Sequence, residues 1–160
     1  MKLESLAKIF EMVGVAVVIT SLYFIYEELK LTKQSIRSGS NVHLLGLSFQ
    51  IREDIAINSE FAELLVKADS AFSSLDKAEL KQYYAHISRS FDIWEQAYFS
   101  RGDSFIHDDI WHAWDCSYRE LFSRAGPKHY WYAKSNTYSS KFKSYINQKV
   151  IQSKDNNTCS

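Results

Sequence analysis

The stretch from Ile9 to Tyr26, IFEMVGVAVVITSLYFIY, decides the fold of this chain because Glu11 is its only charged residue. Its eighteen residues would rise about 27 Å as a helix, close to the roughly 30 Å hydrocarbon core of a bilayer. A buried core helix would carry a polar stripe, and a cleaved signal peptide would have a shorter apolar region followed by small residues. The stretch therefore predicts a single uncleaved transmembrane helix over residues 9–28.

Small residues within this span indicate that two such helices can approach closely. Gly14, Ala16 and Thr20 are small, and Ala16 and Thr20 have the four-residue spacing found at helix contacts in lipid. The pattern predicts self-association in addition to contact with the lipid bilayer.

The composition predicts one all-α domain beyond the span. Hydrophobic residues make up 46% of the 160 residues and aromatic residues 15%, while one proline and five glycines leave few turns for strands. We expect a short N-terminal tail (1–8), a stalk that continues the transmembrane helix (29–40), an aromatic-rich bundle of four to five helices (41–152) and a flexible tail (153–160).

Capping residues and apolar periodicity define the helices expected in this bundle. Asp76 and Glu79 have the form of a capping box before a long helix, which should end at Gly102 in the left-handed conformation. Apolar residues recur along that helix at steps of three and four: Leu80, Tyr83, Tyr84, Ile87, Phe91, Trp94 and Tyr98. We expect it to pack antiparallel to the helix that follows it, and we place His86 and Arg89 on its exposed side.

Other boundaries follow from single residues. Ser38-Gly39-Ser40 should end the stalk, and Gly126-Pro127 should stop the helix after the long one. The caps expected for the remaining helices are Ser40 or Asn41, Ser59, Asp108 and Thr137.

The net charge of zero conceals an uneven distribution. Residues 38–123 carry seven basic and fourteen acidic side chains, whereas residues 124–154 carry seven basic and none acidic. The basic segment could attract the acidic body within the fold, lie against anionic lipid, or bind nucleic acid. Its aromatic residues follow the period of a buried face, which favours a core role for them. The basic residues expected at its surface are Lys128, Lys134, Lys141, Lys143 and Lys149.

The two cysteines and the histidines predict no disulfide, metal or cofactor. Cys116 and Cys159 lie far apart in sequence, so we interpret them as free thiols compatible with a reducing compartment, with Cys116 as a packing residue. His112 and Asp115 are one helical turn apart, as in a partial metal site. The neighbouring acidic residues are explained as a cap and a first-turn charge.

Charges beside the span predict its orientation. Lys30, Lys33 and Arg37 follow it, against Lys2 and Lys8 before it. Cytoplasmic flanks carry the excess of lysine and arginine, so the helical domain is expected in the cytoplasm.

The anchor resembles that of a broad group of small uncharacterised bacterial membrane proteins. The similarity rests on Glu11, Gly14, Ala16-Val17-Val18, Ser21-Leu22 and Phe24, leading into Glu27, Leu29 and Lys30. It extends to segments 58–64 and 102–111 and to Tyr130-Trp131. The resemblance implies a single-pass protein of the bacterial inner membrane with a cytoplasmic helical domain, and it brings no established activity.

A second resemblance concerns the segment Arg101-Gly-Asp-Ser-Phe-Ile-His107, which fits the Arg-x4-6-His signature of HEPN ribonucleases. Members of that family dimerise so that paired arginines and histidines act on RNA, and membrane-anchored HEPN-like proteins accompany CRISPR systems and form pores. The resemblance implies that Arg101 and His107 are catalytic, or that the chain is an inactive pore-forming relative in phage defence. The alternative is that Arg101 is a favourable charge at a helix C-terminus and His107 a loop residue.

Together these patterns predict a membrane-anchored helical interaction or oligomerisation protein without evident catalysis. Its expected partners are the bilayer, further copies of itself and an unknown protein, and the HEPN-like alternative adds RNA.

Overall fold

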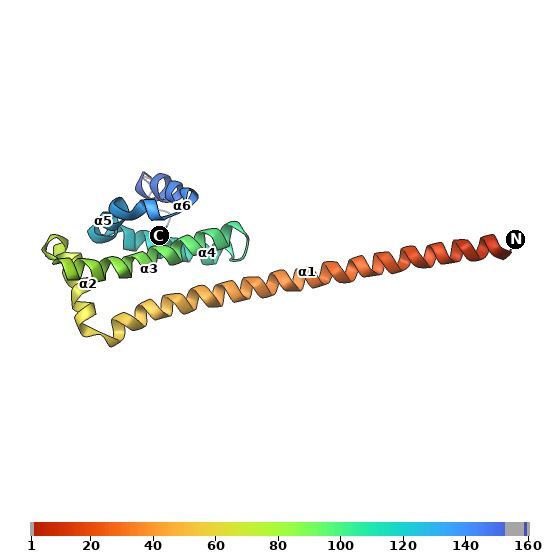
Figure 1. Ribbon diagram of the computed structural model, residues 1–160, viewed down its shortest axis with the longest axis horizontal. Helices are drawn as coiled ribbons and strands as arrows, with labels where there is room; N and C mark the ends of the chain where they lie inside the picture. Colours follow the sequence, from red (N-terminus) through yellow and green to blue (C-terminus); the bar gives the residue numbers. More distant parts are fainter. Residues whose placement is uncertain (1, 153–158, 160) are drawn as a thin grey trace. The chain divides into compact units, whose positions relative to one another are not determined.

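The computed structural model describes residues 2–152 and 159, and within them the chain is helical, with no strand (Figure 1). The predicted all-α class is confirmed. Its α-helices are α1 (Lys2–Ile57), α2 (Ser59–Ala71), α3 (Lys77–Gly102), α4 (Asp108–Ser123), α5 (Ala125–Lys134) and α6 (Ser140–Tyr145). Two 3-10 turns, Phe72–Ser74 and Ser135–Thr137, follow α2 and α5, and a π-helical segment, Ile146–Ile151, follows α6. Apart from Cys159, the predicted tail 153–160 lies outside the described residues.

The chain divides into two compact units, Met1–Gly39 and Ser40–Ser160, and α1 contributes to both. The break predicted at Ser38-Gly39-Ser40 was wrong, because α1 remains helical through these residues and neither Ser40 nor Asn41 caps a new helix. A glycine inside a helix destabilises that helix by only about 1 kcal/mol relative to alanine. Burial of Leu44 and the packing of Leu47 in the next two turns outweigh that cost.

The core of the second unit is built on α3. Tyr83, Ile87, Phe91 and Trp94 are all buried on this helix, which confirms the predicted apolar face. Helices α3 and α4 pack side by side and are joined by a short loop, as expected for the antiparallel pair (Figure 1). The expected aromatic-rich core is also confirmed, since aromatic rings from α3, α4, α5 and α6 contact one another across it.

Two pairs of polar atoms lie among these rings. The Trp131 Nε1 donates a hydrogen bond to Asn147 Oδ1 at 3.1 Å, and the hydroxyls of Tyr130 and Tyr138 share one at 3.0 Å. Large aromatic side chains with a polar group need such partners when they are buried.

The capping box of α3 is confirmed. The carboxylate of Asp76 accepts hydrogen bonds from the backbone of α3, and Glu79 accepts one from the Asp76 N–H. Two other predicted caps were displaced by one or two residues. Asn58, rather than Ser59, caps α2, and Ser139, rather than Thr137, caps α6. The Thr137 hydroxyl instead donates to the Lys134 carbonyl within a 3-10 turn.

The loop between α3 and α4 also differs from the prediction. Gly102 is still helical, and the positive φ of 59° belongs to Ser104 instead. His107 occupies the N-cap position of α4 without a side-chain cap bond, so Asp108 is the first helical residue and not the cap. Aspartate is favourable there because the N-terminal end of a helix carries partial positive charge.

Gly126 and Pro127 begin a helix rather than stopping one. Helix α4 ends at Ser123, and both residues lie in the first turn of α5, where proline loses no helical hydrogen bond. Glycine is required at 126 because a Cβ atom there would lie 2.1 Å from the Tyr83 hydroxyl oxygen. Helix α5 therefore packs closer to α3 than any larger residue would allow.

Candidate functional site

A groove of about 540 Å³ lies in the second unit, between the end of α1 and helix α4. Its floor is formed by α3, with Ile87 and the buried Ser90, and α2 contributes to one end. The walls are mainly apolar and aromatic: Leu45, Ile51 and Ile55 from α1, and Trp114, Tyr118 and Leu121 from α4. Grooves of this size with apolar walls between the helices of a bundle are typical ligand or partner sites.

The charges at the rim of the groove balance. Arg124 and Asp69 form an ion pair of 2.8 Å, and both side chains are about half exposed. Arg52 and Glu120, one from each wall, add one charge of each sign. The groove therefore offers no net charge to a small ion and suits an apolar surface with polar edges.

His86 lines the groove and is not solvated as predicted. Its ring packs against Phe61 with centroids 5.1 Å apart, and burial, followed by the nearby charge of Arg89, lowers the pKa of His86. Arg89 is exposed but forms an ion pair with Asp54 of α1. The prediction placed both residues on a free face, because the sequence did not indicate that α1 and α2 cover this side of α3.

Burial also keeps a wall residue neutral. It raises the pKa of Tyr118, so its hydroxyl stays protonated to a higher pH than that of a free tyrosine.

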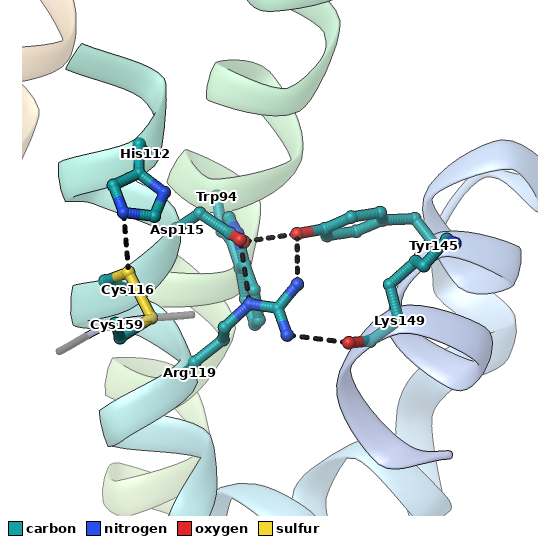
Figure 2. Close-up of a disulfide and its surroundings, with 8 residues drawn as sticks. All are labelled: Trp94, His112, Asp115, Cys116, Arg119, Tyr145, Lys149 and Cys159. Atoms are coloured by element: carbon teal, nitrogen blue, oxygen red, sulfur yellow. Dashed lines mark hydrogen bonds and ion pairs between the residues drawn. A yellow bond between two sulfur atoms is a disulfide. The ribbon is translucent and has the colours of Figure 1, made fainter. Parts of the chain in front are cut away.

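A second polar cluster lies around Asp115, which is only 7% exposed (Figure 2). Its carboxylate accepts hydrogen bonds from Trp94 Nε1 at 3.2 Å, from Arg119 Nε at 2.8 Å and from the Tyr145 hydroxyl. Arg119 also donates to the Tyr145 hydroxyl at 3.0 Å and to the Lys149 carbonyl at 2.6 Å. The cluster thus connects α3 and α4 to α6 and the π-helical segment.

The environment raises the pKa of two members of this cluster, Tyr145 and Arg119. Burial and the hydrogen bond to Asp115 raise the pKa of Tyr145, so it remains a donor. Burial lowers the pKa of Arg119, but its bonds to Asp115 and Tyr145 outweigh that effect and raise it. Asp115, Arg119 and Tyr145 are paired with one another and with Trp94 and the Lys149 carbonyl, so they form a structural ion-pair cluster that links these helices.

The two cysteines form a disulfide next to this cluster, so their interpretation as free thiols was wrong (Figure 2). Cys116 of α4 is bonded to Cys159, which lies 43 positions later in the sequence, and their Cα atoms are 5.4 Å apart. His112, one turn before Cys116, places Nε2 3.8 Å from its Sγ. The sequence could not reveal the pair, because cysteines so far apart meet only through the fold.

The structure places Arg101 and His107 at the two ends of the loop between α3 and α4. Arg101 Nε donates to Asp108 Oδ1 at 2.9 Å, and its guanidinium lies 5.6 Å from the centre of the Trp111 ring. His107 is exposed at the N-cap position of α4. No hydrogen bond or ion pair links Arg101 to His107 in the part of the chain that the structure describes.

Comparison with known protein families, with curated proteins and with solved structures gave no match to this chain. In residues 2–152 and 159, no three His, Cys, Asp or Glu side chains gather as ligands of a metal ion would.

The basic residues of the C-terminal segment lie on the surface, apart from Lys143, which is half-buried. The aromatic residues between them are mostly core, as predicted: Tyr130, Trp131, Tyr138 and Phe142 are buried. Tyr132 is the exception and is exposed.

The candidate span is exposed along its described length. Helix α1 contains Ile9, and every residue from Phe10 to Tyr26 is exposed, including Gly14, Ala16 and Thr20. The Thr20 hydroxyl donates to the Ala16 carbonyl at 2.8 Å. Such a bond satisfies a hydroxyl that would otherwise lack a partner in hydrocarbon.

The sequence analysis missed the Asp115 cluster. Asp115 and Arg119 have the four-residue spacing of a helical ion pair, which is a usable signal. Their partners Trp94, Tyr145 and Lys149 come from distant segments and could not be identified.

Proposed function

We propose that the chain is a membrane-anchored interaction protein whose helical domain binds a protein partner in the groove between α1 and α4. The observation that carries the proposal is the exposure of the apolar stretch of α1. This stretch is long and apolar enough to cross a bilayer, and none of its most apolar window is buried by the rest of the chain. A core helix of a soluble protein would be covered, so lipid is the environment that suits this surface.

A helix of the partner protein suits the groove. The walls are themselves helices with mainly apolar side chains, and the rim carries balanced charges, as in proteins that receive an amphipathic helix in a groove. The apolar face of such a helix would cover Leu45, Trp114 and Leu121, and its polar edges would meet the rim.

Membrane extraction tests the anchor. The full chain should stay with membranes after washing with alkaline carbonate. A variant with Val13→Lys and Val17→Lys should be released, since each charge near the bilayer centre costs about 2.5–3.5 kcal/mol. Release of the unaltered chain by carbonate would contradict the proposal.

Site-specific photo-crosslinking in cells tests the groove. A photoreactive amino acid in place of Ser117, on the α4 wall, should give a discrete protein adduct. The same group in place of Lys128, which is exposed outside the groove, should not. Equal labelling from both positions would show that the groove has no special affinity.

Catalysis on RNA is not part of this proposal. It would require Arg101 and His107 to meet on one phosphodiester, whereas Arg101 is held by Asp108 and Trp111.

Two features of the chain point to opposite sides of the membrane, and one measurement decides between them. The excess of lysine and arginine after the span favours a cytoplasmic domain. The bond between Cys116 and Cys159 is typical of oxidising compartments.

Thiol alkylation decides between the two orientations when cells are lysed under conditions that prevent thiol–disulfide exchange. Both cysteines should stay unlabelled if the domain is outside the cytoplasm. Full labelling would place it inside.

A further inference from the structure

The two residues of the disulfide differ in their access to solvent. Cys159 is exposed, whereas Cys116 of α4 is half-buried. Exchange with an external thiol begins when that thiol attacks one of the two sulfurs, and access decides which sulfur is attacked. This difference makes Cys159 the point of attack and Cys116 the residue whose sulfur leaves.

His112 lies beside the leaving sulfur. It precedes Cys116 by one turn of α4, and its Nε2 lies 3.8 Å from the Cys116 Sγ (Figure 2). The residue is itself exposed, so its imidazole can exchange protons with water. A protonated imidazole next to a sulfur stabilises the thiolate form of that sulfur, which then leaves a disulfide faster.

Other contacts hold the C-terminal segment of the domain to α4. Arg119 donates a hydrogen bond to the Lys149 carbonyl, and Asp115 accepts one from the Tyr145 hydroxyl. The Trp111 ring of α4 also packs against the Tyr145 ring, with centroids 5.8 Å apart. None of these contacts involves the disulfide, so they can persist when it opens.

We propose that the bond between Cys116 and Cys159 is a redox-active site, which a dithiol reduces by attack on Cys159. One sulfur of the dithiol, as a thiolate, forms a bond to the Cys159 Sγ, and Cys116 leaves as a thiolate beside His112. The second sulfur of the dithiol then attacks the first and releases the Cys159 thiolate.

The two steps balance in electrons and protons. The protein disulfide gains two electrons, and the dithiol loses the same two as it becomes a disulfide. The two protons given up by the dithiol end on the two cysteines, and His112 can pass the first of them to Cys116. Such a bond takes the redox state of its compartment on either side of the membrane, so the proposal does not depend on the anchor or on the groove.

Trapping of the first step with glutathione tests the order of attack. Glutathione has a single thiol, so its mixed disulfide with the protein can be trapped when acid stops the exchange. In the full-length protein in a mild detergent, mass spectrometry of peptic fragments should find glutathione on Cys159 and a free thiol at Cys116. Glutathione mainly on Cys116 would overturn the proposal.

The rate of reduction by dithiothreitol at neutral pH tests the role of His112. His112→Leu should slow reduction by about three- to tenfold, because the leaving sulfur loses the group that stabilises its thiolate. His112→Lys keeps a positive charge at this position and should retain most of the rate. His107→Leu is the matched control, since His107 is also exposed but lies at the N-cap position of α4, and it should leave the rate unchanged.

Three results of these rate measurements would overturn the proposal. The first is an equal rate in His112→Leu and His107→Leu. The second is a rate that does not rise with the concentration of dithiothreitol, because unfolding of the domain would then limit access to the bond. The third is loss of helical structure on reduction, measured by far-UV circular dichroism of the full-length protein before and after the reaction.

Discussion

Replacing Asp115 with alanine should destabilise the helical domain more than any change at its surface. The substitution removes the acceptor for Trp94, Arg119 and Tyr145 at once. Breaking a buried ion pair by removing one partner costs about 3–5 kcal/mol, because the remaining charge and donors are left unpaired. The Arg119 side chain keeps 21% exposure and can recover some hydration, so we expect about 3–4 kcal/mol.

Thermal unfolding of the full-length protein in detergent measures this loss. Unfolding entropy is about 2.1 cal/mol/K per residue. For the roughly 120 residues of the unit Ser40–Ser160, a loss of 3–4 kcal/mol then lowers the Tm by about 12–16 °C. All four tryptophans lie in this unit, so fluorescence excited at their absorption edge reports its unfolding alone.

Asp109→Ala is the matched control for this experiment. Asp109 lies on the same helix, is exposed and makes no ion pair within the described residues. Loss of the Asp109 carboxylate should lower the free energy of unfolding by less than about 1 kcal/mol, because only its favourable interaction with the N-terminus of the helix is removed. If Asp115→Ala shifts the Tm by no more than Asp109→Ala does, the cluster is not a structural ion pair of the kind described.

Three further outcomes are expected of the same protein. Reduction of the disulfide, or Cys159→Ser, should lower the free energy of unfolding by about 2–4 kcal/mol, since the bond closes a long loop. As a control, a reductant should not change the stability of a variant that lacks both Cys116 and Cys159. Gly126→Ala should destabilise the domain by about 1–3 kcal/mol through overlap with a buried tyrosine. Gly102→Ala should be neutral or stabilising in the same thermal melts, because nothing lies within 4 Å of the added carbon and the φ of Gly102 is not positive. A comparable loss of stability in both glycine variants would refute the close packing of α5. Because burial and a nearby arginine hold the pKa of His86 below 6.5, the unfolded state takes up the proton first as the pH falls. Stability should therefore decline below about pH 6.5, and His86→Phe should reduce that decline in melts at pH 7.5 and 5.5; an equal decline in both proteins would contradict the assignment.

Local signals in the sequence predicted the local structure well. The capping box at Asp76 fixed the start of α3, because its two hydrogen bonds depend on residues three positions apart. The apolar periodicity from Tyr83 to Trp94 identified the buried face of the same helix for a similar reason.

Prediction failed where distant segments decide the outcome. Gly39 looked like a helix end, but burial of neighbouring residues keeps α1 helical. The pairing of Cys116 with Cys159 and the partners of Asp115 depend on how α4 meets the C-terminal segment. The groove could not be predicted for the same reason, since its lining residues come from four helices that no local pattern places side by side.

The polar atoms on the core rings have a consequence for how the domain loses its structure. A core of aliphatic side chains can loosen while its helices persist, which gives the molten globule state. In this core, the polar edge of each large ring forms a hydrogen bond. This holds for Trp94, Trp131 and Tyr145, and the hydroxyls of Tyr130 and Tyr138 bond to each other. A ring cannot turn without leaving a buried donor unpaired, so loosening and helix loss should coincide in a single cooperative transition.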